Sequence, residues 1–186
     1  MNKLNQNIFL IGPMGSGKTT IGKQLAKRFG LDFYDCDHEL ERLTGASVNL
    51  IFDLEGEKGF RLRESNVLKQ LTAKKGVLIA TGGGTVCNEK NRRLLSSRGL
   101  VVYLKTSINN QLKRLNKDKS RPLLQAQDRT QRLQELAEVR NPLYEATADL
   151  VFSTRNSSVY ATAKALSSVI MERLDTLGRE QVHADS

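Results

Sequence analysis

Residues 12–19, with the sequence GPMGSGKT, have the types and spacing needed to bind the phosphates of a nucleotide. They match the pattern G-x-x-x-x-G-K-[ST], in which glycines let backbone N–H groups turn toward phosphate oxygens. Lys18 supplies a positive charge, the hydroxyl of Thr19 suits a Mg²⁺ ligand, and the N-terminus of a following helix adds partial positive charge. These residues therefore predict binding of a nucleoside triphosphate.

The segments on both sides of this loop support that prediction. Residues 7–11 form an apolar run typical of a short buried strand, and residues 20–29 have helical spacing of apolar side chains. The alternative is a glycine-rich turn that binds nothing, and the pattern arises by chance in roughly 1 chain in 100 of this length. A strand before the loop and a helix after it favour the phosphate-binding function.

Carboxylates and glycines stand directly after the next two predicted strands. Asp35 and Asp37 follow a strand predicted at residues 33–34, and residues 81–85, with the sequence TGGGT, follow a strand predicted at residues 77–80. Ligands of open parallel sheets bind beyond the carboxyl ends of the strands. We therefore expect these two loops and the phosphate-binding loop to converge on one crevice.

The two carboxylates have a functional and a structural explanation. They occupy alternate positions of an extended segment, so that one can reach the Mg²⁺ shell and the other a substrate hydroxyl. In the structural alternative, Asp37 only caps a helix that begins at His38, and Asp35 ends a turn. His38 and His183 carry no functional prediction.

Three arginines have local contexts that would suit an anionic ligand. Arg61 and Glu64 lie three residues apart at the start of a predicted helix and are expected to hold each other in place. Arg121 precedes a proline beside a basic stretch, where it would reach the transferred phosphate from a closing lid. Arg140 lies shortly before Pro142, which is expected to kink its helix toward the crevice. For each arginine alone, an ordinary surface ion pair explains the sequence equally well.

Apolar segments alternate with helical patterns along the whole chain, which predicts βαβ units and a parallel sheet. Further strands are expected at residues 100–104 and 150–152, and Ser107 and Ser158 are expected to cap helices. Helices are expected at residues 18–29, 37–43, 47–54, 59–72, 89–97, 108–116, 129–144 and 159–174.

Length and composition fit one compact enzyme domain. The chain has 186 residues, of which 39% are hydrophobic, and no run approaches the roughly 18 apolar residues of a membrane span. Cys36 and Cys87 are the only cysteines in the sequence and lack the spacing of a zinc site, so they are expected to be reduced thiols. We expect a soluble cytoplasmic protein with no membrane partner.

The chain is basic, with 29 Lys and Arg residues against 20 Asp and Glu residues and a formal net charge of +9. The densest basic cluster, residues 113–121, contains no aromatic residue, and aromatics make up 5% of the chain. A base-stacking surface for nucleic acid is therefore not expected, and a lid over phosphates explains the cluster better. Charge alone leaves a nucleotide-responsive or RNA-binding protein as the alternative from another class.

Two other classes of nucleotide protein fit poorly. A GTPase is suggested by the D-x-x-G form of residues 53–56, but the guanine-reading N-K-x-D pattern is absent, since residues 116–119 read NKDK. A large ATPase usually ends its third strand in an acidic metal ligand, whereas residues 77–80 run into Thr81 and glycine. The metal carboxylate is therefore expected from the loop that contains Asp35.

Taken in order, six segments resemble bacterial shikimate kinases over about residues 7–154: GPMGSGKTTIG, FYDCDHELE, FDLEGEKGFRLRE, ATGGGTV, RPLL and RNPLYE. The resemblance implies a three-layer P-loop kinase fold of the α/β class, with a five-stranded parallel sheet in the order 2-3-1-4-5. It implies a mobile lid, ATP with Mg²⁺ as phosphoryl donor, and shikimate, phosphorylated on its 3-hydroxyl, as acceptor on the route to chorismate. It also implies a monomer. We expect a single kinase domain at residues 1–174, a lid at about 113–128, and a flexible tail at 175–186 that the resemblance does not explain.

The resemblance also assigns individual residues. Lys18, Asp37 and Arg121 would be catalytic, and Thr19 and Asp35 would lie at the metal. The acceptor would be bound by Asp37, Arg61, Gly82, Gly83, Gly84 and Arg140. ATP would be bound by Gly15, Ser16, Gly17, Lys18, Thr19, Thr20, Arg114, Arg121 and Ser157. A related small-metabolite kinase, such as a gluconate kinase, is the alternative, since its phosphate loop and lid would look alike.

Overall fold

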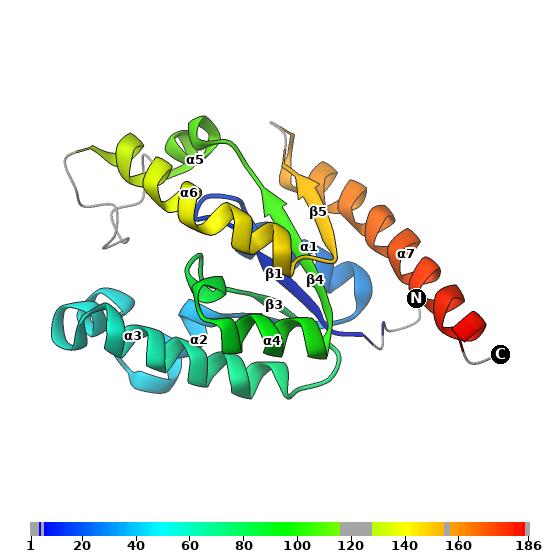
Figure 1. Ribbon diagram of the computed structural model, residues 1–186, viewed down its shortest axis with the longest axis horizontal. Coiled ribbons are helices and arrows are strands. Elements are labelled where there is room, and N and C mark those ends of the chain that lie inside the picture. Colours follow the sequence, from blue (N-terminus) through cyan, green and yellow to red (C-terminus); the bar gives the residue numbers. More distant parts are fainter. Residues whose placement is uncertain (1–3, 5, 116–127, 155–156, 185–186) are drawn as a thin grey trace.

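The computed structural model describes residues 4, 6–115, 128–154 and 157–184 of the chain (Figure 1). The described residues form a five-stranded sheet in which every strand is parallel to its neighbours, in the order β2-β3-β1-β4-β5. The predicted fold class and strand order are therefore confirmed. The strands are β1 (Ile8–Ile11), β2 (Asp32–Asp35), β3 (Val77–Ala80), β4 (Leu100–Lys105) and β5 (Leu150–Ser153).

Helices cover both faces of the sheet and create three layers (Figure 1). Side chains of α1 and α7 pack on one face, and side chains of α2, α3, α4 and α6 pack on the other. The helices are α1 (Lys18–Phe29), α2 (Cys36–Thr44), α3 (Val48–Thr72), α4 (Glu89–Arg98), α5 (Ile108–Leu115), α6 (Arg129–Thr147) and α7 (Val159–Ala184), with a 3₁₀ turn at Thr85–Cys87.

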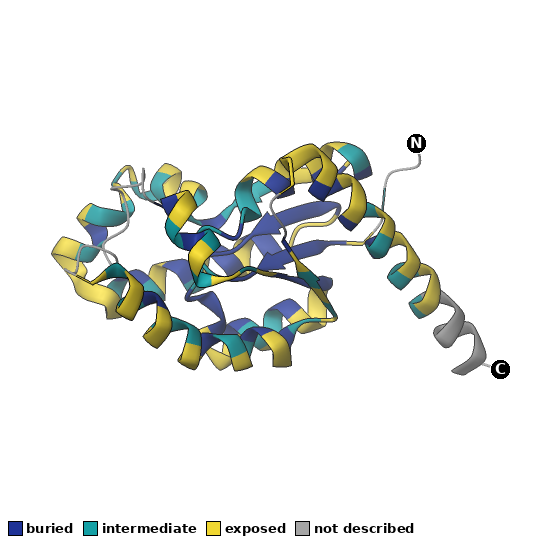
Figure 2. Cartoon of the chain, turned by 90° about the horizontal axis from the view of Figure 1, so that it is seen from above, coloured by how far each residue is buried: buried dark blue, intermediate teal, exposed yellow. Residues whose placement is uncertain are grey.

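Successive residues of the central strand β1 belong to different layers of the core. Ile8 and Leu10 contact the layer that contains α1 and α7, whereas Phe9 and Ile11 contact the opposite layer. All four residues have no exposed surface, as expected for a strand covered on both faces. Figure 2 shows a buried centre of the sheet between partly exposed helices; β1, β3 and β4 form this centre, whereas the edge strands β2 and β5 are partly exposed. This rigid centre carries the loops that form the site.

Several helix boundaries match their sequence signals. The hydroxyls of Ser107 and Ser158 accept hydrogen bonds from the N–H groups of Asn110 and Ala161, so both predicted caps are confirmed. The segments predicted as separate helices at 47–54 and 59–72 form one element, α3, interrupted at Gly56, which has a φ of 67°. The predicted end of the last helix at Leu174 was wrong, because α7 continues to Ala184.

The capping role considered for Asp37 belongs to Asp35 instead. The Oδ1 atom of Asp35 accepts hydrogen bonds from the N–H groups of Asp37, at 3.0 Å, and His38, at 3.4 Å. Helix α2 consequently begins at Cys36, and Asp37 lies in its first turn. The side chain of Asp37 is therefore not the cap of α2.

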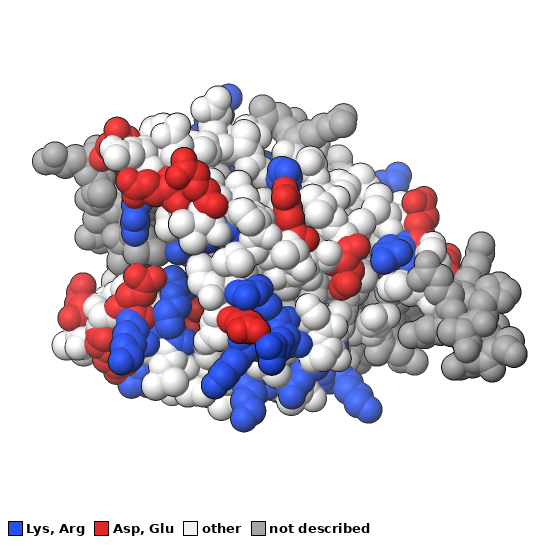
Figure 3. All heavy atoms as spheres, viewed as in Figure 1, with Lys and Arg blue, Asp and Glu red and all other residues white. Residues whose placement is uncertain are grey.

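Part of the positive charge of the chain lies on α4 and the adjoining end of α3. Figure 3 shows basic side chains gathered over α4 and the adjoining part of α3. In α4, Glu89 is the one carboxylate among four basic residues, and it pairs with Arg93. This arrangement is that of an ordinary solvated surface.

Candidate active site

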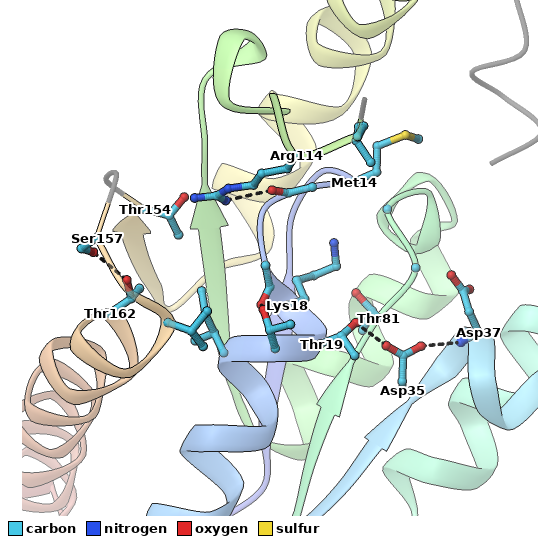
Figure 4. A pocket seen from close by; sticks show the side chains of 18 residues that line it. Met14, Lys18, Thr19, Asp35, Asp37, Thr81, Arg114, Thr154, Ser157 and Thr162 are labelled. Atoms are coloured by element: carbon cyan, nitrogen blue, oxygen red, sulfur yellow. Dashed lines mark hydrogen bonds between the residues drawn. The ribbon is translucent and has the colours of Figure 1, made fainter. Parts of the chain in front are cut away.

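The loops after β1, β2 and β3 converge on one cavity, as the sequence predicted. Its volume is about 470 Å³, and it lies at the carboxyl ends of the strands (Figure 4). The predicted ATP-binding residues Gly15, Gly17, Lys18, Thr19, Thr20, Arg114 and Ser157 line it. So do the predicted metal and acceptor residues Asp35, Asp37, Gly82 and Gly83.

The backbone of the phosphate-binding loop requires glycine at specific positions. Gly15 and Gly17 have φ values of 75° and 95°, in the left-handed region that side chains other than glycine rarely adopt. The Nζ atom of Lys18 donates hydrogen bonds to the carbonyls of Gly12, at 2.8 Å, and Pro13, at 2.9 Å. The loop thus holds its own lysine at the cavity wall, and the side chain of Ser16 lies fully buried beneath it.

Thr19 and Asp35 form the part of the site that would hold a metal. The Thr19 hydroxyl donates to Oδ2 of Asp35 at 2.6 Å, which brings together oxygen atoms from α1 and β2 (Figure 4). Among the described residues, no group of three His, Cys, Asp or Glu side chains is spaced to hold a metal. One hydroxyl and one carboxylate fit Mg²⁺, which usually keeps several waters and takes its remaining ligands from phosphates.

A second, smaller cavity of about 50 Å³ adjoins the first. Both cavities are lined by Met14, Asp37, Gly82 and Gly83. Only the smaller one is lined by Val48, Phe52, Phe60, Arg61, Glu64, Gly84 and Arg140. All six predicted acceptor-binding residues therefore lie around the smaller cavity, in direct continuity with the phosphate-binding loop.

Arg61 is held in this cavity by a buried carboxylate. Its Nη1 donates to Oε2 of Glu64 at 2.9 Å, and Glu64, whose side chain is 1% exposed, also accepts a hydrogen bond from the Thr85 hydroxyl at 2.8 Å. The predicted pairing of Arg61 with Glu64 is confirmed. Burial raises the pKa of Glu64, against the lowering effect of Arg61 and the Thr85 hydroxyl.

The glycine loop after β3 packs tightly against this ion pair. A Cβ atom at Gly82 would lie 2.3 Å from Oε1 of Glu64, and one at Gly84 would lie 2.3 Å from Nη2 of Arg61. A Cβ at Gly83 would meet no atom closer than 3.5 Å. A side chain at the first or third glycine would therefore displace Glu64 or Arg61.

Arg140 reaches the smaller cavity from α6. The residue is 7% exposed, and its Nη1 lies 3.7 Å from the position of a Cβ on Gly83. Helix α6 is continuous through Pro142, from Arg129 to Thr147. Arg61 and Arg140 therefore bring two guanidinium groups to one small cavity from different elements.

The far end of the larger cavity is lined by hydroxyl groups and one arginine. Arg114 Nη1 donates to the Gly15 carbonyl at 2.9 Å, and the hydroxyls of Ser157 and Thr162 are 2.8 Å apart (Figure 4). Thr154 lines the same end. Arg121 lies outside the described residues, as do residues 116–127 of the predicted lid.

Sequence reasoning missed several residues of the two cavities. Phe52 and Phe60, whose ring centroids are 4.5 Å apart, give the smaller cavity an apolar wall, and Met14 lines both cavities. Their apolar character was the only sequence signal, and it does not distinguish a cavity wall from the core. Thr154 and Thr162 follow the last strand, where the resemblance had assigned only Ser157 to ATP.

Comparisons with known proteins agree with this geometry. The family model of shikimate kinase matches residues 14–174. A shikimate kinase of Alteromonas mediterranea is 54% identical over 165 residues, which are 89% of this chain and 96% of that protein. A shikimate kinase of Pasteurella multocida is 48% identical over 173 residues, which are 92% of this chain and 97% of that protein.

The solved structures that resemble this chain include both a shikimate kinase and a gluconokinase, and the shikimate kinase is the more similar of the two. A shikimate kinase from Acinetobacter baumannii in complex with shikimate superimposes with a TM-score of 0.89 at 45% identity, over 91% of this chain and 95% of that one. A gluconokinase from Sinorhizobium meliloti gives a TM-score of 0.61 at 17% identity, over 95% of this chain and 99% of that one, a likeness of fold alone. With the family model and close relatives both spanning most of its length, this chain belongs to the shikimate kinase family.

Proposed function

We propose that this enzyme transfers the γ-phosphoryl group of ATP to the 3-hydroxyl of shikimate, giving shikimate 3-phosphate and ADP. The observation that carries the proposal is the contact between the two cavities. Asp37, Gly82 and Gly83 line both, so an acceptor in the smaller cavity would lie beside phosphates bound by the glycine-rich loop. The relative from Acinetobacter baumannii, which is described in complex with shikimate, supports the choice of acceptor.

The smaller cavity suits a small hydroxylated carboxylic acid. Arg61 and Arg140 would bind the carboxylate, because guanidinium groups form paired, charge-assisted hydrogen bonds with carboxylates. Glu64 holds Arg61 from behind, so less conformational freedom is lost when the acceptor binds. The rings of Phe52 and Phe60 would contact the ring of the acceptor.

The larger cavity suits ATP. Residues 15–20 and the Lys18 ammonium would surround the phosphates, and Thr19 and Asp35 would hold Mg²⁺. When bound, Mg²⁺ supplies positive charge to the phosphate oxygens and shields the developing charge of the leaving group. Arg114 and the hydroxyls of Thr154, Ser157 and Thr162 would then face the nucleoside end.

Alignment and charge stabilisation account for most of the expected rate enhancement. The bond between the acceptor oxygen and the γ-phosphorus forms as the bond from that phosphorus to the β,γ-bridging oxygen breaks, through a loose transition state. Asp37 would orient the attacking hydroxyl and accept its proton late in the reaction. Lys18 stabilises charge on the transferred group, and Arg121 is proposed to do so from a lid over residues 113–128.

Several further properties remain part of the proposal. We propose a cytoplasmic monomer with a single kinase domain. The flexible tail expected at residues 175–186 is not proposed again, because α7 continues to Ala184. ATP and shikimate would be its partners, without nucleic acid or a membrane. Within the described part of the chain, no helix is both long and apolar enough to cross a membrane.

The test is ADP release from Mg²⁺-ATP with and without shikimate, using gluconate and quinate as comparison acceptors. The proposal expects strong stimulation by shikimate alone. Stimulation by another acceptor would overturn the substrate while keeping the phosphoryl transfer. Absence of stimulation by all three would overturn the proposed reaction for this chain.

A further inference from the structure

Tyr144 connects helix α6 to the glycine loop that the two cavities share. Its hydroxyl donates a hydrogen bond of 2.5 Å to the carbonyl of Gly83. The tyrosine is 1% exposed, and its ring stacks on that of Tyr103, with centroids 4.9 Å apart. The hydroxyl is thus aimed at the loop by a ring that is itself fixed in the core.

The carbonyl groups of the three glycines have different partners. Those of Gly82 and Gly84 accept local hydrogen bonds, from the N–H groups of Thr85 and Cys87. The carbonyl of the middle glycine, Gly83, accepts the hydrogen bond from Tyr144, 61 residues away in sequence. This bond therefore sets the position of the loop relative to α6, the helix that carries Arg140.

The same bond fixes the direction of a backbone donor. The described chain contains no cis peptide bond, and in a planar trans peptide the carbonyl and the following N–H point in opposite directions. With the Gly83 carbonyl held by Tyr144, the N–H of Gly84 points away from α6. Gly84 lines the smaller cavity, so the orientation of this peptide shapes the wall against which the acceptor would bind.

We infer that Tyr144 is a positioning residue for acceptor binding: its hydroxyl holds the Gly83–Gly84 peptide in the orientation that the smaller cavity requires. The inference rests on the proposed function, because the acceptor is taken to be shikimate. The Tyr144 hydroxyl contacts the loop and also interacts with the side chain of Arg140. Tyr144 does not itself line either of the two cavities that meet at Asp37. Tyr144 lies four residues after Arg140, so one turn of α6 carries both the residue that contacts the loop and the arginine that would bind the acceptor carboxylate.

The test compares Tyr144→Phe with Tyr103→Phe. The first change removes the hydroxyl that holds Gly83 while keeping the stacked ring. The second change removes the hydroxyl of the other ring in the stack, which donates a hydrogen bond to Oδ1 of Asn141 at 3.4 Å. The dissociation constant for shikimate, KM for both substrates and kcat are measured for each variant and for the wild type, together with Tm.

We expect Tyr144→Phe to raise the dissociation constant for shikimate about 5- to 10-fold, since a buried carbonyl loses its partner. KM for ATP should stay within about twofold, and Tyr103→Phe should resemble the wild type in both constants. Equal weakening of shikimate and ATP binding in Tyr144→Phe, or an unchanged affinity for shikimate, would overturn the inference. A wild-type enzyme that shikimate does not stimulate would instead overturn the proposed function.

Amide hydrogen exchange tests the route through the loop. In Tyr144→Phe, exchange of the amides of residues 82–85 should accelerate, while that of strand β3 stays as in the wild type. Weaker shikimate binding with unchanged exchange in this loop would show that the hydroxyl acts elsewhere, and would overturn the inference. The retained ring stack favours folding of the variant, and its Tm checks that directly.

Discussion

Gly84→Ala should impair shikimate binding by displacing Arg61. A Cβ atom at residue 84 would lie 2.3 Å from Nη2 of Arg61 and 2.5 Å from Cζ. Carbon atoms pack at about 3.5 to 4 Å, so the guanidinium has to move by roughly 1 Å or more. The guanidinium is the free end of a flexible side chain, and the protein should therefore fold with Arg61 displaced.

The expected loss follows from the hydrogen bonds that Arg61 would make to the acceptor. A hydrogen bond that involves a charged group contributes about 1.5 to 3 kcal/mol. Losing that contribution raises the dissociation constant for shikimate roughly 10- to 100-fold. Binding of ATP should change little, because Gly84 and Arg61 line only the smaller of the two cavities.

A double-mutant cycle with Arg61→Ala isolates this cause. Once the guanidinium is absent, a methyl group at residue 84 has nothing to displace, so Gly84→Ala should cost less than about twofold in that background. Titration calorimetry of shikimate binding to the four proteins provides the measurement. An equal loss from Gly84→Ala in both backgrounds would refute the steric argument, and so would a single variant that binds shikimate normally.

Gly83→Ala should leave Tm within about 2 °C of the wild type, because its Cβ would meet no atom closer than 3.5 Å. Gly82→Ala should lower Tm by about 6 to 12 °C, since disturbing the buried pair of Glu64 and Arg61 costs about 3 kcal/mol. Calorimetric scans in which Gly83→Ala has the lower Tm would contradict the packing described for Gly82. Arg121→Ala should lower kcat about 100-fold or more without changing Tm, and a kcat within threefold of the wild type would exclude the lid role. The pKa of Glu64 is raised in the folded state, so the stability of the wild type relative to Glu64→Gln should depend on pH. This stability difference should be greatest below the ordinary glutamate pKa and should fall as pH rises through the folded-state pKa. Urea titrations that give a constant difference across that range would contradict this.

The order of the strands and most elements could be predicted because their signals are local. A buried strand such as Val77–Ala80, or a helix start with a serine cap, can be recognised from a few consecutive residues. The structural alternative named Asp37 as the cap of α2, whereas Asp35 caps it; both residues have a capping side chain, and only backbone geometry separates them. The extent of α7 was missed because its apolar pattern weakens after Leu174.

The parts of the site that escaped prediction depend on contacts between distant segments. The resemblance assigned the triple glycine to acceptor binding, but no sequence pattern indicates that Gly82 lies against Glu64 and Gly84 against Arg61. The hydrogen bond from Tyr144 to Gly83 joins segments with no shared sequence pattern. Spacing reveals which residues lie at the ends of strands, but not which side chains meet there.

The central position of β1 has a consequence for how the protein is made. Leu10 pairs with Ala80 on one side and with Val102 on the other, so the first strand to leave the ribosome lies between the third and the fourth. At about 5 to 20 residues per second, Leu10 waits roughly 5 to 20 s before Val102 is synthesised. Strand β3 is available earlier, but until β4 emerges the other edge of this entirely apolar strand has no partner, which leaves the nascent chain open to aggregation.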